Sequence, residues 1–138
     1  MAELNCICLK YGTAYGAEFV NRLYAGLLRN TTKDLRLFCM TDDPAGIDPR
    51  VELLDLPQEP FAERMERAMR TAPKQGRLKK ISLFRPGLIP DLKGPLLVLD
   101  LDVAVVGPVD ELWDHAPGKV CMRREWRRSS RAPSLGHG

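Results

Sequence analysis

Three short segments of the chain are apolar on both of their alternating faces, and this feature limits the possible folds more than any other. They cover residues 4–9, 35–40 and 96–99. A strand that is apolar on both faces must be covered on both sides, as in a parallel sheet with helices on each face. The pattern predicts an open, mainly parallel α/β sheet, with residues 4–9 as a central strand and residues 96–99 buried on both faces.

Helical and turn signals lie between these strands. Residues 17–30 place Phe19, Leu23 and Leu27 along one face of a predicted helix. Strands that alternate with helices predict one α/β domain over residues 1–138. We expect residues 127–138, which are nearly devoid of large apolar side chains, to form a flexible C-terminal segment. The complete set of predicted elements comprises strands over 4–9, 35–41, 51–56 and 96–102 and helices over 17–30, 60–72 and 78–84.

Apolar runs in this sequence are short. None exceeds four residues, as in 96–99 and 103–106, whereas a membrane-spanning helix needs about 20 apolar residues. The N-terminus has Glu3 before its apolar residues and Lys10 after them, the reverse of a signal peptide. We therefore expect no membrane span and a cytoplasmic location.

Positive charge is concentrated near the C-terminus. The chain has 21 Lys and Arg against 18 Asp and Glu; residues 119–138 carry a net charge of +5, whereas residues 1–118 carry −2. Nucleic acid is therefore not an expected partner of the domain as a whole. The arginines around Trp126 are expected to form a solvated arm, with contacts to phosphate or a base as the alternative. His137, beside the C-terminus, is not expected to be a ligand.

The four cysteines contain no Cys-x-x-Cys pair. We expect Cys6, Cys8, Cys39 and Cys121 to be buried thiols. Cys6 and Cys8 share one face of their predicted strand and Cys39 lies on another strand, so a metal cluster is conceivable. No nearby fourth Cys or His completes such a cluster.

Two carboxylates interrupt the apolar run of residues 96–107, and this is the strongest functional signal. In an extended strand the side chains of Asp100 and Asp102 point the same way, about 6.5 Å apart. Burying two like charges without partners is costly. Mn²⁺ or Mg²⁺ removes this cost, because both bind carboxylate and phosphate oxygens. The sequence predicts a metal site that holds a diphosphate; in the alternative, both carboxylates enter solvent and cap the next turn.

Open parallel sheets bind ligands beyond the carboxyl ends of their strands. We therefore expect the ligand near three segments of this chain, which are Lys10-Tyr11-Gly12, Thr41-Asp42-Asp43 and Asp100-Leu101-Asp102.

The segment VLDLDVAVVGPVDELW, preceded by LKKISLFRPGL, resembles the bacterial glycosyltransferase-family-eight or glycogenin-like group, which has the GT-A type of fold. The shared signature is an apolar strand, Asp-x-Asp, an apolar triplet, Gly and an acidic-apolar helix start. The resemblance extends from KYGTAYG through MTDD to the C-terminal region. It implies a metal-dependent glycosyltransferase that uses a nucleotide-diphospho-sugar donor, with retention of anomeric configuration and an acceptor that the sequence does not identify.

The resemblance also implies roles for individual residues. Asp100 and Asp102 would coordinate Mn²⁺ or Mg²⁺ against the donor diphosphate, with Asp100 also near the ribose. Lys80 would approach the acidic end of the donor. For the loop residues, turn and helix-cap roles remain equal alternatives. The other implied donor contacts are Lys10, Tyr11, Gly12, Thr13, Asp42, Asp43 and Leu101.

Members of this family continue beyond the point that corresponds to Gly138. We therefore expect this chain to be the donor-binding N-terminal part of the enzyme, and nucleotide-sugar recognition rather than full turnover is the activity that we assign to it. One alternative is a haloacid-dehalogenase-like phosphatase with Asp100 as nucleophile and Asp102 as general acid and base. That motif normally opens its domain, whereas 99 residues precede Asp100 here. The other alternative is a noncatalytic module that binds nucleotides or nucleic acid through its arginine-rich end.

Overall fold

Four parallel strands form one sheet in the order β3-β2-β1-β4. The computed structural model describes residues 3–56, 64, 67, 70 and 77–122. The predicted α/β class, the parallel sheet and the interior position of the first strand are confirmed. The strands are β1 (Glu3–Lys10), β2 (Asp34–Thr41), β3 (Glu52–Asp55) and β4 (Leu97–Val98).

β1 and β2 pair along their full lengths. Their register runs from Glu3 opposite Asp34 to Lys10 opposite Thr41. The two strands therefore end at the same edge of the sheet. This alignment places the loops that follow them side by side.

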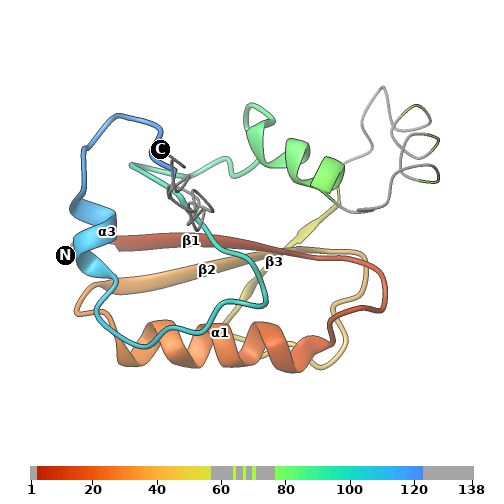
Figure 1. Cartoon of the computed structure of the whole chain (residues 1–138), viewed down its shortest axis with the longest axis horizontal. Helices are drawn as coiled ribbons and strands as arrows, with labels where there is room; N and C mark the ends of the chain where they lie inside the picture. Colours follow the sequence, from red (N-terminus) through yellow and green to blue (C-terminus); the bar gives the residue numbers. More distant parts are fainter. Residues whose placement is uncertain (1–2, 57–63, 65–66, 68–69, 71–76, 123–138) are drawn as a thin grey trace, which may run out of the picture.

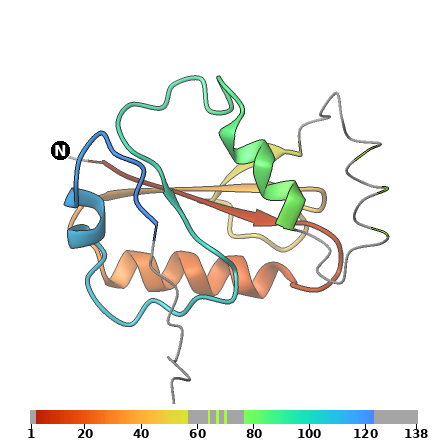
Figure 2. The same cartoon turned by 45° about the horizontal axis from the view of Figure 1, so that its top comes forward.

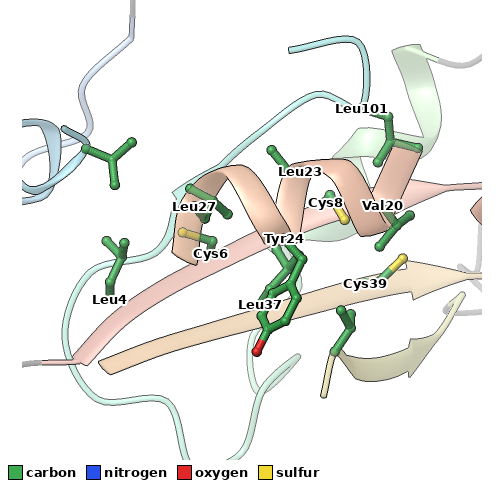
Figure 3. Packing of buried hydrophobic residues seen from close by; sticks show 12 residues of the cluster. Leu4, Cys6, Cys8, Val20, Leu23, Tyr24, Leu27, Leu37, Cys39 and Leu101 are labelled. Atoms are coloured by element: carbon green, nitrogen blue, oxygen red, sulfur yellow. The ribbon is translucent and has the colours of Figure 1, made fainter. Parts of the chain in front are cut away.

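Helix α1 (Ala17–Arg29) covers one face of the sheet. Val20, Leu23 and Leu27 belong to one buried cluster with Leu4 and Leu37 of the sheet (Figure 3). The apolar face read from the sequence is thus the face that packs. The helix ends as predicted at Asn30, whose backbone N–H donates to Leu27 O at 3.0 Å.

The short 3₁₀ helix η1 (Arg77–Phe84) lies on the opposite side of the sheet from α1 (Figures 1 and 2). Ile7, Phe38 and Met40 form a second buried cluster on this face, and Leu83 of η1 packs against it. Because helices cover both faces of the sheet, the side chains of β1 and β2 that point to either face are mostly apolar. The short helix predicted over 78–84 is therefore confirmed.

The prediction of a strand over residues 96–102 is wrong in its length. β4 contains only Leu97 and Val98, which pair with β1, and Leu99 N still donates to Ile7 O at 3.0 Å. The chain then turns, and Val103 N donates to Asp100 O at 3.4 Å. It leaves the sheet because the following segment packs along α1 instead.

The prediction that residues 96–99 are buried on both faces is also wrong. Val98 is 50% exposed. β4 is an edge strand that pairs on one side only, and the cluster beneath η1 includes Leu96 but not Val98. On the face that carries η1, the packed side chains therefore lie over β1 and β2 and do not reach Val98.

Residues 103–109 run along α1 toward α3 (Asp110–Asp114) (Figure 1). A Cβ on Gly26 would lie 3.1 Å from Val105 Cβ, so the glycine permits this close approach. Val109 N donates to Asn30 O at 3.0 Å. The segment that follows the two aspartates is thereby fixed to α1.

Two predicted segments fall in residues that the structure does not describe. Of the helix expected over 60–72, Arg64, Arg67 and Arg70 are helical and exposed, and the remainder lies outside the described residues. The segment 127–138, expected to be flexible, lies outside them entirely.

The part of the chain with assigned structure contains no helix that is both long and apolar enough to cross a bilayer.

Asp110 joins the start of α3 to the end of α1. Its carboxylate accepts hydrogen bonds from the hydroxyl of Thr31 and from the hydroxyl and backbone N–H of Thr32, the latter two at 2.7 and 3.0 Å. These hydrogen bonds, with the charge of Lys33, lower the pKa of Asp110 below its usual value. The ionised form is therefore the one that the fold favours.

We predict that Asp110→Asn lowers the free energy of unfolding at pH 7. Because folding depresses this pKa, the stabilisation is complete above the unfolded pKa of about 4 and is lost as pH falls through the lower folded value. The deficit of the variant should therefore shrink below pH 4 in urea titrations at several pH values. Glu111→Gln removes an equal charge from the same helix turn and serves as control; an identical pH profile for both variants would contradict the prediction.

Candidate functional site

The connections on either side of β1 lie on opposite faces of the sheet. α1 follows β1 on one face, whereas η1 precedes β4 on the other (Figures 1 and 2). Open parallel sheets bind ligands at such a point, beyond the carboxyl ends of the two neighbouring strands. We call the ends of β1 and β4, with the residues that follow them as far as Gly12 and Asp102, the β1/β4 edge.

Asp100 forms an ion pair with Lys80 at this edge. The lysine belongs to η1 and the aspartate follows β4, so the pair joins two elements that are distant in the chain. Both side chains are about half exposed, at 44% and 54%. The pair is therefore accessible to a solute.

Leu101 fixes the turn between the two aspartates. It is buried against α1 in the same cluster as Val20 and Leu23 (Figure 3). Asp102 is exposed and has no hydrogen-bond or ion-pair partner among the described residues. Asp100 thus already contacts a cationic side chain, that of Lys80, whereas Asp102 does not.

The donor atoms of this turn suit a hard divalent cation. Asp100 and Asp102 offer carboxylate oxygens, which Mn²⁺ and Mg²⁺ prefer. Within the described residues no group of three or more His, Cys, Asp or Glu is placed to hold a metal ion. The extended geometry that was expected to point both carboxylates the same way is absent, because the chain turns at residues 100–103. The donor types alone fit a cation that takes at most two ligands from this turn and the others from a bound anion or water.

The loops after β1 and β2 are bonded to each other. Lys10 is 4% exposed, and its Nζ donates to Asp43 O at 3.2 Å. Gly12 N donates to Asp42 Oδ2 at 3.1 Å. Gly12 has a φ of +64°, a conformation that favours glycine. The structure thus brings Lys10, Gly12, Asp42 and Asp43 together, whereas their predicted role in binding the donor stays a prediction.

Within the described part of the chain, the hydrogen bonds of Lys10, Gly12 and Asp42 join the ends of β1 and β2 to each other. None of these hydrogen bonds reaches Asp100 or Lys80. Asp43 Oδ1 accepts from Ala45 N at 3.0 Å, which is the turn role left open by the sequence. Thr13 is exposed and Tyr11 is half-buried.

Sequence reasoning missed the position of Asn5. It is fully buried in β1, and its Nδ2 donates to Lys93 O at 3.2 Å. Its Oδ1 is buried and has no hydrogen-bond partner among the residues that the structure describes. The sequence does show that Asn5 is a polar residue within an apolar strand. It does not show that the Asn5 side chain bonds to a loop carbonyl 88 residues away.

Three of the four cysteines are buried as predicted, but Cys121 is exposed. Cys121 lies beyond α3, where the neighbouring Val120 and Met122 are also exposed, so no packed element covers it. Burial raises the pKa of Cys6 to about 12, and a hydrogen bond with Cys39 together with burial raises that of Cys8. Because the described residues contain no group of three or more His, Cys, Asp or Glu placed to hold a metal ion, Cys6, Cys8 and Cys39 do not form the conceivable metal cluster there.

We predict one fast-reacting thiol in the native chain. A thiol reagent such as dithionitrobenzoate attacks exposed thiolate, so Cys121 should react at once and the three buried cysteines only on unfolding. The absorbance of the released thionitrobenzoate counts the reacting thiols. Cys121→Ser should leave no fast phase, while fast reaction of a second thiol would show that the sheet core is open.

Comparisons with known proteins identify no relative of this chain. No family model, curated protein or solved structure matches the chain. The arrangement of the residues at the β1/β4 edge is therefore the basis for a functional assignment.

Proposed function

We propose that this chain is the donor-binding part of a metal-dependent, retaining glycosyltransferase that uses a nucleotide-diphospho-sugar. The observation that supports this best is the ion pair between Lys80 and Asp100 at the β1/β4 edge. It places a cation and a carboxylate where an open parallel sheet binds its ligand. The resemblance of the Asp-x-Asp segment to glycosyltransferase family eight is the reason for proposing a nucleotide-diphospho-sugar as the ligand.

Charge explains why a metal is needed. A diphosphate and the carboxylates of Asp100 and Asp102 are all anions, and Lys80 supplies a single positive charge beside them. Mn²⁺ or Mg²⁺ held by the two aspartates would act as a Lewis acid on the departing nucleoside diphosphate. Lys80 would donate a hydrogen bond to the same anion, which strengthens with the charge that develops.

The loops after β1 and β2 would bind the nucleoside. Lys10 and Asp43 hold these loops together, and Asp42 fixes the backbone of Gly12. An ordered loop costs less conformational entropy when a ligand binds. Tyr11 and Thr13 lie in this ordered segment and would contact the nucleotide.

We predict that nucleoside diphosphates bind only in the presence of Mn²⁺ or Mg²⁺. Asp102→Asn keeps the shape of the side chain but removes a charged ligand, so we expect about tenfold or greater weakening of the metal-dependent binding. Isothermal titration calorimetry with uridine, guanosine, adenosine and cytidine diphosphates, in Mn²⁺ and in EDTA, measures both effects. Circular dichroism should show an unchanged fold.

Asp55→Asn is the matched control for this experiment. Asp55 is an exposed carboxylate at the end of β3, the strand farthest from β4, and its loss should not change binding. Equal affinity with metal and with EDTA would contradict the proposal, and so would an unaffected Asp102→Asn variant. Release of inorganic phosphate from the nucleotides would instead support the phosphatase alternative.

A further inference from the structure

The ammonium group of Lys80 occupies a coordination direction of the Asp100 carboxylate. We propose that Lys80 is an exchangeable cation: it holds Asp100 in the free protein, is displaced when the divalent metal binds, and then pairs with the diphosphate. This inference rests on the proposed function and adds to it a coupling between metal and diphosphate binding.

Lys80 and a metal compete because both need the same carboxylate. Lys80 Nζ bonds to Asp100 Oδ1. A metal bound to that carboxylate would lie within a few ångströms of the ammonium group, at a distance where like charges repel strongly. Metal binding to the free protein therefore opposes the Lys80–Asp100 pair and favours the departure of Lys80.

The structure permits Lys80 to leave without unfolding η1. The side chain is 44% exposed and has a flexible four-carbon stem. The helix itself is anchored separately, by Leu83 in the cluster with Ile7 and Phe38. Its last turn is closed by Arg85 N, which donates to Ser82 O at 3.2 Å. Only the end of the lysine side chain needs to move.

Asp102 makes the exchange possible from the other side of the turn. It is exposed and has no ion-pair or hydrogen-bond partner within the described part of the chain. A divalent cation can therefore bind Asp102 first and then compete for Asp100. Once a diphosphate is present, the displaced ammonium gains a new anionic partner, so metal and diphosphate should each increase the affinity for the other.

The first test measures Mn²⁺ alone by electron paramagnetic resonance, which detects free Mn²⁺ in a titration. Lys80→Met keeps the stem and removes the competing charge, so we expect about fivefold tighter Mn²⁺ binding than in the unaltered chain. In an Asp100→Asn background the same change should give no gain. Lys33→Met is the control, because it breaks another lysine–aspartate pair, with Asp114 at 3.2 Å, and removes the same charge.

The second test adds pyrophosphate at saturating Mn²⁺ and measures its affinity by calorimetry. Lys80→Met should bind pyrophosphate about tenfold more weakly than the unaltered chain, because the charge-assisted hydrogen bond from the displaced ammonium is lost. Lys80→Arg should restore part of this affinity. Tighter Mn²⁺ binding combined with weaker pyrophosphate binding is the expected result, and a purely structural role for Lys80 would not produce it.

The outcomes separate this inference from the proposed function. If Mn²⁺ binds the unaltered chain and Lys80→Met equally, exchange is overturned while metal-dependent donor binding stands. If Lys80→Met gains Mn²⁺ affinity but loses none for pyrophosphate, the transfer of Lys80 to the diphosphate is overturned. If no variant binds Mn²⁺ with or without pyrophosphate, both the exchange and the proposed function are wrong.

Discussion

The burial of β1 on both of its faces is the constraint on which the rest of the structure depends. Leu4, Cys6 and Cys8 pack beneath α1, while Ile7 packs in the cluster beneath η1. This strand also pairs with β2 along its whole length and with β4 on its other side. The position of every candidate ligand-binding segment is therefore set relative to β1.

The sequence predicts those parts of the fold in which local pattern and final environment agree. Residues 4–9 and 17–30 have patterns that only two-sided and one-sided burial, respectively, satisfy well. β4 differs, because an apolar run does not indicate whether a strand is central or at an edge. Its length and the exposure of Val98 depend on where η1 and α1 end, which is a property of the assembled chain.

The candidate site also has a part that the sequence predicts and a part that it does not. Asp100 and Asp102 stand out because charge interrupts an apolar run, and the parallel sheet places the loops after β1 and β2 at one edge. The resemblance implies that Lys80 belongs to the same site, but its pairing with Asp100, 20 residues away in a different element, is not visible in the sequence. Because Asp100 pairs with Lys80 and Asp102 does not, the two carboxylates differ in their electrostatic surroundings. The Asp-x-Asp motif alone does not indicate this difference.

The pairing of β4 with β1 also bears on how the chain folds. β1 and β2 are joined through α1, so their pairing closes a short loop, whereas Leu97 reaches Cys6 only after most of the chain has been traversed. Long-range pairings form more slowly because a larger loop must close first. The β1-α1-β2 unit should therefore assemble early, and the aspartate turn should reach its place beside η1 among the last steps of folding.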